Sequence, residues 1–340
     1  MRYEIPSLET KEALEFARRL SEIDVTEPFT FGAKMKWVRP FGMLLTASSI
    51  KQFRNKYLAY PFNLEYLLSK ESVSYAAHMG FFRAISEKIE LGKEPGGAIG
   101  NDNYIPITEI DLNQVHRDEI LQGRIIPIGD AIEKKSKELA RILSRSNDEI
   151  HIVLTYLIRE TIRNIQEHSG SCKAWVCGQY WSDQTAEIAV LDEGVGVRSS
   201  LYKNPVHRQY VNTDCDAIVY AIKAGISRSF HPATPKCAED PWANSGFGLY
   251  MISEICRELN GSFCLASGNS YINILSDGKT ESGKTMFAGT AVKIMISTDY
   301  LGKGRDVIRK IASQGEVQAK LIRNAFKKAS VPSKGFIDDM

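Results

Sequence analysis

Cysteine is scarce in this sequence, and it does not occur in the spacings that build metal sites or disulfide frameworks. None of the six cysteines forms a C-x-x-C pair, and five of them lie in apolar or mixed segments. Zinc sites and disulfide-rich secreted domains depend on such pairs, so we expect buried free thiols. The six are Cys172, Cys177, Cys215, Cys237, Cys256 and Cys264.

Long apolar runs are also missing, so no segment approaches the length of a membrane span. The segment MRYEIPSLETKEALEF at the start lacks the basic residues, apolar stretch and cleavage site of a signal peptide. The formal net charge is only +2, which gives no general attraction to nucleic acid or to a membrane surface. We therefore expect a cytoplasmic protein that has no membrane contact and no indicated nucleic-acid partner.

In its hydrophobic and charged fractions, the sequence is that of an ordinary globular protein. The chain has 340 residues, of which 43% are hydrophobic and 25% charged, enough for two domains of common size. Residues 1–125 are predicted to form a small α/β domain of strand–helix repeats. It includes a helix over 12–23, a strand over 29–37 and an apolar helical stripe over 43–57. The Gly/Pro/Asn-rich segment 92–103 is predicted to be a loop.

A second domain is predicted over residues 126–300. Its clearest element is a long helix with Asn147 or Asp148 as N-cap and Gly170 as its stop. Strand candidates, an irregular stretch over 198–245 and a further helix follow. The remaining strand candidates are 261–267, 270–276 and 290–297, and residues 301–340 are predicted to be a basic C-terminal helix and tail.

The segment Ser276–Thr285 contains G-x-x-x-x-G-K-T, the pattern of a phosphate-binding P-loop. A P-loop needs a strand before it and a helix after it, because the helix N-terminus and the loop amides together hold the phosphates. Here the following segment, Met286–Ser297, alternates apolar and β-branched residues around Gly289 and has no helical stripe. The sequence therefore predicts a solvated hairpin tip, with Lys284 in a polar connection between two strands.

Polar residues on the long helix give a better nucleotide signal. Glu160, Asn164 and His168 follow one another at i, i+4 spacing, which stacks them along one side of the helix at the border of its apolar stripe. A polar helix face is the plainer interpretation of such a trio. The next pattern is D-x-G-x-G, from Asp192 to Gly196, where a strand ends. A carboxylate at that point can accept a hydrogen bond while the glycine backbone closes around a flat ring, although a simple turn has the same pattern.

Two further glycine patterns follow in the chain. Gly246 and Gly248 open a helix, whose N-terminus offers unpaired amides and a positive dipole end to phosphate. Gly289 and Thr290 are predicted to open the last strand of the domain. Each pattern is weak alone, but the four occur in the order helix, strand end, helix start and strand start.

Together these patterns resemble the GHKL family of ATPases, which includes gyrase B-type topoisomerases, MutL proteins and histidine kinases. The resemblance covers roughly residues 130–300. It implies the Bergerat fold, an α/β two-layer sandwich with a mixed sheet and helices on one face, preceded here by the smaller α/β domain. It also implies ATP and Mg²⁺ as ligands of domain 126–300, with an ATP lid over about 198–245.

The resemblance implies a role for each matching residue. Glu160 would be the general base that takes a proton from the water or hydroxyl attacking the γ-phosphate, and Asn164 would bind Mg²⁺. Asp192 would accept the adenine amino proton, supported by the Thr290 hydroxyl, and His168 would lie near the phosphates. Backbone around the base and phosphates would come from Gly194, Gly196, Gly246, Gly248 and Leu249. In the lid, Arg228 and Lys236 are phosphate-contact candidates, and solvated positions suit them equally well.

The first domain is faintly similar to a STAS domain, the partner fold of anti-sigma serine kinases. The similarity lies in a strand, a turn ending in Gly42, a helix and a second strand–helix pair, and it predicts a four- or five-stranded sheet between residues 25 and 110. Arg39, Pro40 and Phe41 fill the place where phosphorylated members carry a serine. We therefore expect this domain to engage a protein partner or a second copy of the chain, without phosphorylation of the turn.

Three functions remain open from the sequence. The first is ATP hydrolysis or a nucleotide-driven switch in signalling, the second a kinase acting on serine or histidine of a separate partner, and the third an ATP-gated binding module without turnover. The lack of a helix with a phospho-accepting histidine disfavours a sensor kinase, and about 40 residues after the last strand leave no transducer domain. The basic C-terminal residues are interrupted by Asp306 and Glu316, which is typical of a solvated helix face.

Overall fold

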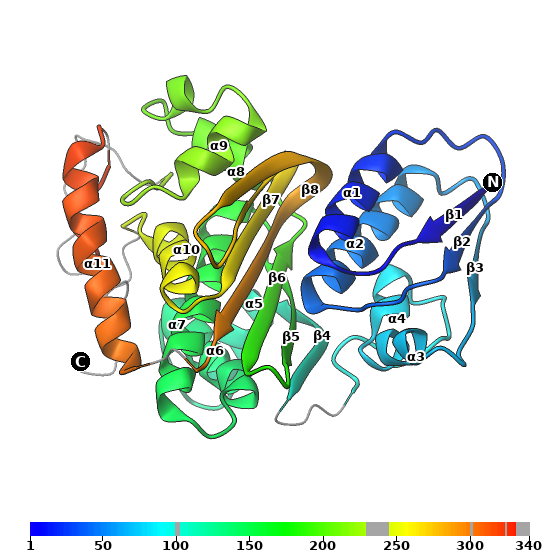
Figure 1. Cartoon of the computed structure of the whole chain (residues 1–340), viewed down its shortest axis with the longest axis horizontal. Coiled ribbons are helices and arrows are strands. Elements are labelled where there is room, and N and C mark those ends of the chain that lie inside the picture. The colour runs from blue at the N-terminus through cyan, green and yellow to red at the C-terminus, as the bar shows by residue number, and fades with distance from the viewer. Residues whose placement is uncertain (99–102, 229–244, 300–301, 324, 331–340) are drawn as a thin grey trace.

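The described part of the chain builds two β-sheets with helices packed between and around them (Figure 1). The computed structural model describes residues 1–98, 103–228, 245–299, 302–323 and 325–330. The smaller sheet is parallel with strand order β1-β2-β3, and the larger has the order β4-β5-β6-β8-β7 with antiparallel neighbours throughout. The strands are β1 (Arg2–Ile5), β2 (Phe29–Ala33), β3 (Phe62–Tyr66), β4 (Tyr104–Asp111), β5 (Lys173–Tyr180), β6 (Thr185–Asp192), β7 (Ser262–Ile274) and β8 (Thr280–Ser297).

The long predicted helix is α7 (Asp148–Asn164), and its ends are fixed by local sequence. Asn147 caps it by accepting a hydrogen bond from the backbone N–H of Ile150 at 3.1 Å, as predicted. One π-helical turn, η1 (Ile165–Ser169), extends it to Gly170, whose φ of 71° ends the helix. The other helices are α1 (Thr10–Ser21), α2 (Pro40–Lys56), α3 (Glu71–His78), α4 (Phe81–Ile85), α5 (Leu112–Leu121), α6 (Ile128–Ser144), α8 (Gly196–Tyr202), η2 (Arg208–Tyr210), α9 (Asp214–Ala221), α10 (Gly248–Glu258) and α11 (Gly304–Leu321).

Successive side chains along each strand point to opposite faces of the larger sheet, and both faces are buried. In β6, Ile188 and Val190 belong to the core that α7 and α10 share, whereas Ala189 and Leu191 belong to the core formed with α1 and α2. Figure 1 shows α1 and α2 between the two sheets, and α7 and α10 on the opposite side of the larger sheet. Both faces of the larger sheet are therefore covered.

These observations correct two parts of the predicted fold class. The chain is α/β and has a smaller α/β unit before the larger sheet, but that sheet is antiparallel, where a mixed one was predicted. It also carries helices on both faces, where the resemblance implied one. The face toward α2 is lined by small residues such as Ala189, Ala266 and Ala291, and small side chains let a helix pack closely on a strand.

The N-terminal unit also differs from its prediction. Its sheet has three parallel strands in the described residues, fewer than the four or five that a STAS-like domain requires. The strand β4, which lies inside the predicted first domain, pairs with β5 in the larger sheet, so the boundary at residue 125 lies too late in the chain. The single helix predicted after β3 is two helices, because Gly80 with a φ of 87° separates α3 from α4.

The P-loop string lies in a long hairpin formed by β7 and β8. The turn occupies residues 275–279, and Lys284 and Thr285 lie within β8. Since a strand follows the string in place of a helix, the prediction that it is no P-loop is confirmed. The predicted strand bounds were wrong, because β7 joins two candidates into one strand and Thr290 lies inside β8 instead of opening it. Lys284 also lies in β8 and not in the predicted connection between strands.

Replacing Lys284 with alanine should leave ATP affinity within about twofold of the wild type, because the side chain is exposed on β8 and lines no part of the cavity described below. Isothermal titration of both proteins with ATP and Mg²⁺ measures this. A loss of binding of tenfold or more would restore the P-loop interpretation.

The cysteines are free thiols in the described residues, as expected. Cys177, Cys256 and Cys264 are buried, but Cys172 and Cys215 are exposed, which corrects the prediction for those two; Cys237 lies outside the described residues. None of the helices in the described part of the chain combines the length and the apolar character that a membrane crossing needs.

The C-terminal helix α11 packs on the same side as α10. Its Ile308, Ile311 and Ala312 are buried in the core shared with α7 and α10, and Gly315 lies against the rings of Phe247 and Tyr250. The helix is therefore part of the larger unit as well as a basic surface.

Candidate functional site

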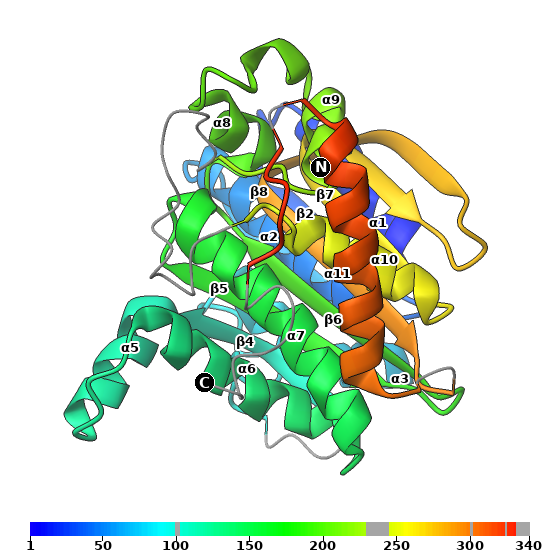
Figure 2. The same ribbon diagram turned by 90° about the vertical axis from the view of Figure 1, so that its left-hand side faces the viewer.

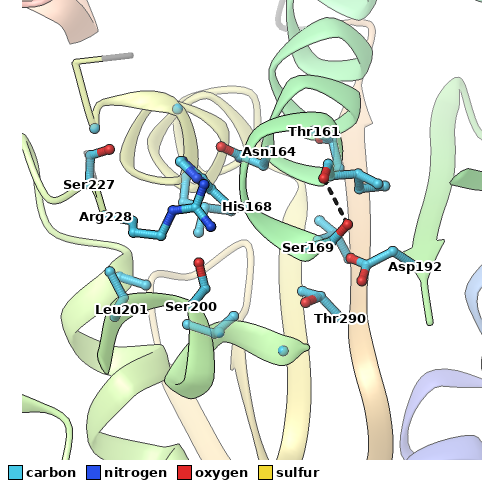
Figure 3. A pocket seen from close by; sticks show the side chains of 18 of the residues that line it. Thr161, Asn164, His168, Ser169, Asp192, Ser200, Leu201, Ser227, Arg228 and Thr290 are labelled. Carbon is cyan, nitrogen blue, oxygen red and sulfur yellow. Dashed lines mark hydrogen bonds between the residues drawn. The ribbon is translucent and has the colours of Figure 1, made fainter. Parts of the chain in front are cut away.

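A cavity opens where the end of β6, the middle of β8, the C-terminal part of α7 and the N-termini of α8 and α10 meet (Figure 3). Its empty volume, with the open solvent at its mouth included, is about 760 Å³. Its lining comes from residues that are far apart in sequence. They are Thr161, Asn164, Ile165, His168, Ser169, Val190, Asp192, Gly196, Val197, Ser200, Leu201, Ala221, Ile226, Ser227, Arg228, Gly246, Gly248, Leu249, Thr290 and Val292.

One wall of the cavity is the α7–η1 helix. Asn164 and His168 line it, one turn apart, together with Thr161. The Nδ2 atom of Asn164 is buried and has no hydrogen-bond partner. A buried N–H donor without a partner costs about 1–3 kcal/mol, so this donor at a cavity wall points to a ligand that offers it a hydrogen-bond acceptor.

Glu160 lies behind this wall and is not part of the lining. Its Oε1 accepts hydrogen bonds from Arg159 at 3.1 and 3.3 Å and forms an ion pair with Arg163 at 3.5 Å. Its Oε2 points the other way, toward the start of α10, and lies 3.0 Å from the place that a Cβ atom on Gly248 would occupy. One oxygen is thus anchored, while the other faces the helix N-terminus.

His168 and Arg228 form the end of the cavity away from the sheet, and Figure 3 shows the guanidinium of Arg228 beside the imidazole. Burial, together with the positive charges of Arg228 and Arg163, lowers the pKa of His168 to about 4. The imidazole is therefore neutral at pH 7. An Nη2 hydrogen bond to the backbone oxygen of Glu167 orients the Arg228 side chain.

Asp192 forms the floor at the end of β6, and its side chain is 3% exposed. Burial raises its pKa to about 6, while hydrogen bonds from the Gly194 N–H and the Thr290 side chain oppose that rise. The Gly194 N–H donates to Oδ1 at 2.8 Å. Both Asp192 and Thr290 line the cavity. Thr290 is the partner of Asp192 in the register of β6 and β8, which explains why two distant residues meet here.

Glycines bring the backbone close to Asp192. A Cβ atom on Gly194 would lie 2.3 Å from the backbone oxygen of Ser169, and one on Gly289 would lie 2.0 Å from the backbone oxygen of Asp192. Gly194 itself does not line the cavity, whereas Gly196 does. In the D-x-G-x-G pattern, Gly194 therefore allows close backbone packing behind the cavity floor, whereas Gly196 forms part of the lining.

Ser267 connects these glycine segments and was missed by the sequence analysis. Its hydroxyl donates to the backbone oxygen of Gly289 at 2.7 Å and accepts from the Val197 N–H at 3.0 Å. A Cβ atom on Gly196 would lie 2.8 Å from that hydroxyl oxygen. No motif marks a serine in the middle of β7, so only the strand pairing reveals it.

The N-terminus of α10 forms the wall opposite the sheet floor. Gly248 is its first residue, and Gly246, with a φ of 70°, makes the turn before it. A Cβ atom on Gly246 would lie 2.4 Å from the backbone of Ile226, so the glycine is required by close approach. Leu249 also lines the cavity. A Cβ atom on Gly248 would lie 3.5 Å from Asn164 Nδ2, so the start of α10 lies beside the Asn164 wall.

The predicted irregular stretch 198–245 is helical in part, since it contains α9 and most of α8. Lys236 lies outside the described residues. Arg228 borders the cavity, as do Ser200 and Ser227, which no sequence pattern singled out. The described part of this stretch thus covers one side of the cavity.

The donor set suits one kind of metal better than others. In the described part of the chain no group of three or more His, Cys, Asp or Glu side chains is arranged to hold a metal ion. The single amide oxygen of Asn164 beside the N-terminus of α10 would suit Mg²⁺, which takes few protein ligands and completes its shell with water and substrate phosphates. No protein-family model matches this chain, and no curated protein matches it either.

Proposed function

We propose that this chain is a GHKL-family ATPase that binds ATP with Mg²⁺ in the cavity between α7, α10 and the larger sheet. The single observation that carries the proposal is the meeting, in one cavity, of the buried Asp192 carboxylate and the buried unpaired amide of Asn164. These residues are 28 positions apart in sequence, and the family pattern requires both.

Asp192 supplies base selectivity in this proposal. Its second carboxylate oxygen accepts the adenine amino proton, and Thr290 supports the same edge of the ring. Guanine presents a carbonyl oxygen where adenine has its amino group, so two acceptors would face each other and GTP binding would be disfavoured. The apolar side chains of Val190 and Leu201 cover the base.

The phosphates are bound at the other end of the cavity. The N-terminus of α10 offers backbone N–H groups and a positive dipole end, and Arg228 adds a guanidinium. Asn164 would hold Mg²⁺ there through its side-chain oxygen, and the bound ion would offset phosphate charge during hydrolysis. Neutral His168 adds a hydrogen-bonding group without further charge.

Glu160 is the proton acceptor for the attacking water. Its Oε2 faces the start of α10, where the phosphates end, and its Oε1 stays fixed on Arg159 and Arg163. A carboxylate held by one oxygen keeps its orientation while the other oxygen accepts a proton. Hydrolysis and lid closure together make the protein a nucleotide-driven switch.

Equilibrium titration with ATP, ADP and GTP, with and without Mg²⁺, tests the proposal. We expect ATP to bind at least about 100-fold more tightly than GTP, and thin-layer chromatography of γ-labelled ATP to show free phosphate. Absence of ATP binding would overturn the proposal. Label transferred to protein would instead identify a kinase, and bound but intact ATP would identify a module without turnover.

Replacing Asn164 with alanine should remove the Mg²⁺ dependence of ATP binding. We expect affinity in the presence of Mg²⁺ to fall about tenfold or more, toward the value measured in EDTA. Gln166→Ala is the matched control, because Gln166 is an exposed amide on the same helical segment that does not line the cavity. Unchanged Mg²⁺ dependence in Asn164→Ala would contradict the assignment of the metal.

A further inference from the structure

The dipeptide at the end of β6 connects the cavity with the N-terminal unit. Asp192 faces the cavity, and the next side chain, Glu193, points to the opposite face of the sheet, where α2 packs. There its Oε1 accepts a hydrogen bond from the Ser48 hydroxyl at 2.5 Å, and its Oε2 pairs with Lys51 at 2.8 Å. Two side chains of α2 thus hold the residue that follows Asp192.

Gln52, also on α2, forms hydrogen bonds with the neighbouring strand, β8. Its side-chain Nε2 donates to the backbone oxygen of Ala288 at 2.9 Å, and its Oε1 accepts from the Ala288 N–H at 3.2 Å. Ala288 lies two residues before Thr290 in β8. A single amide side chain therefore satisfies both backbone groups of one residue in that strand.

The two contacts meet at the floor of the cavity. Gly289 separates Ala288 from Thr290, and its backbone packs directly on that of Asp192, since a Cβ there would lie 2.0 Å from the Asp192 backbone oxygen. Neither Ser48 nor Lys51 nor Gln52 lines the cavity. Any effect they have on a ligand must pass through the backbone of residues 192–193 and 288–290.

We infer that Ser48, Lys51 and Gln52 of α2 are positioning residues for base recognition, so that the N-terminal unit controls the adenine end of the nucleotide site. This inference rests on the proposed function, and it adds the element that regulates the site. Asp192 and Thr290 meet the base only while β6 and β8 keep their register at this point, and α2 fixes both strands there. A hydrogen bond weakens steeply as its geometry worsens, so small movements of this backbone change base affinity.

The inference gives the N-terminal unit a specific task. A protein partner, or a second copy of the chain, that shifts α2 would weaken ATP binding, and ATP binding would favour the α2 position seen here. Such coupling is reciprocal, and it commonly amounts to a factor of 5–150 in affinity.

The test uses Gln52→Ala in the full chain and measures the dissociation constants of ATP, GTP and inorganic tripolyphosphate. We expect ATP affinity to fall about 5- to 20-fold, in the lower part of the range for coupled sites, while tripolyphosphate affinity stays within about twofold. The preference for ATP over GTP should fall by the same factor as ATP affinity. Asn55→Ala, an exposed amide on α2 next to the contact residues, is the matched control and should leave all three constants unchanged.

Gln52→Glu is a second variant for the case that the alanine variant folds poorly. It keeps the side-chain shape but replaces the donor that holds the Ala288 oxygen with an acceptor, and it should reduce ATP affinity at least as much. An equal loss of ATP and tripolyphosphate affinity would show general destabilisation and would overturn the inference, as would unchanged ATP affinity in both variants. A wild-type chain that binds tripolyphosphate but does not distinguish ATP from GTP would instead defeat the base assignment itself.

Discussion

Replacing Asp192 with asparagine should weaken ATP binding by about 100-fold, equivalent to about 3 kcal/mol. Oδ1 of Asp192 already accepts the Gly194 N–H at 2.8 Å, and an asparagine would keep this bond by leaving its own oxygen there. Its NH₂ group would then take the place of the second carboxylate oxygen. Two donors would face each other at the adenine amino group. Titration calorimetry with ATP measures the loss, and wild-type affinity in the variant would contradict the adenine assignment.

The same substitution should stabilise the ligand-free protein at neutral pH. Burial raises the pKa of Asp192 from 3.8 to about 6, so the folded chain binds this proton more tightly than the unfolded chain does. The favourable contribution is present below pH 3.8 and is lost as pH rises through 6, leaving a buried charge that costs up to about 3 kcal/mol. Asparagine removes that cost. Thermal melts should show a higher Tm for the variant at pH 7.5 and a shrinking difference toward pH 4.

The ATP affinity of the wild type should depend on the protonation state of Asp192. Protonation of Asp192 removes its acceptor charge, so we expect affinity to decline as pH falls through about 6. The Asp192→Asn variant should lack this dependence. A wild-type pH profile identical to that of the variant would remove Asp192 from contact with the base.

Replacing Glu160 with alanine should reduce ATP turnover by about 10²- to 10⁴-fold, the usual contribution of a general base. ATP affinity should change little, because Glu160 does not line the cavity. Arg159 keeps its pairing with Glu133, and Arg163 keeps its pairing with Glu167, so the helix loses no other ion pair. Phosphate release under saturating ATP, together with a separate binding titration, measures both quantities.

Two further variants define the role of Glu160 more closely. Glu160→Gln preserves volume and hydrogen bonding but cannot accept the proton, so it should be as inactive as the alanine variant. Glu138→Ala removes an exposed carboxylate on α6 and should keep full activity. A Glu160 variant that still hydrolyses ATP at the wild-type rate would show that another group accepts the proton.

The positions of the site residues in the fold follow from local patterns, and the sequence was sufficient for most of them. The i, i+4 spacing of Asn164 and His168 placed both on one wall of α7, and the glycines before Leu249 correctly predicted the start of α10. These inferences succeeded because helix periodicity and capping act within a few residues. The prediction that the string is no P-loop succeeded for the same reason, since the alternation after it indicates a strand, although Lys284 lies within β8 and not in the connection before it.

Contacts between distant segments could not be derived in this way. The boundary at residue 125 failed because β4 finds its partner in β5, and no local pattern records which strand a segment will pair with. Ser267 escaped notice for the same reason. The segment of β6 was predicted only as a strand, and no local pattern indicated that α2 covers its second face.

The sequence by itself determined most of the helices and strands and the residues that each presents at its ends, and its resemblance to the GHKL family is what suggests ATP as a ligand. Helical periodicity, capping residues and glycines act on the nearest few residues of the chain. Their effects can therefore be predicted from the sequence alone. Only the tertiary structure decided that Asp192 pairs with Thr290, that Glu160 turns one oxygen to the arginines and the other to α10, and that α2 holds the back of the cavity floor. Those contacts join segments up to 236 residues apart, and the packing of the whole chain selects them.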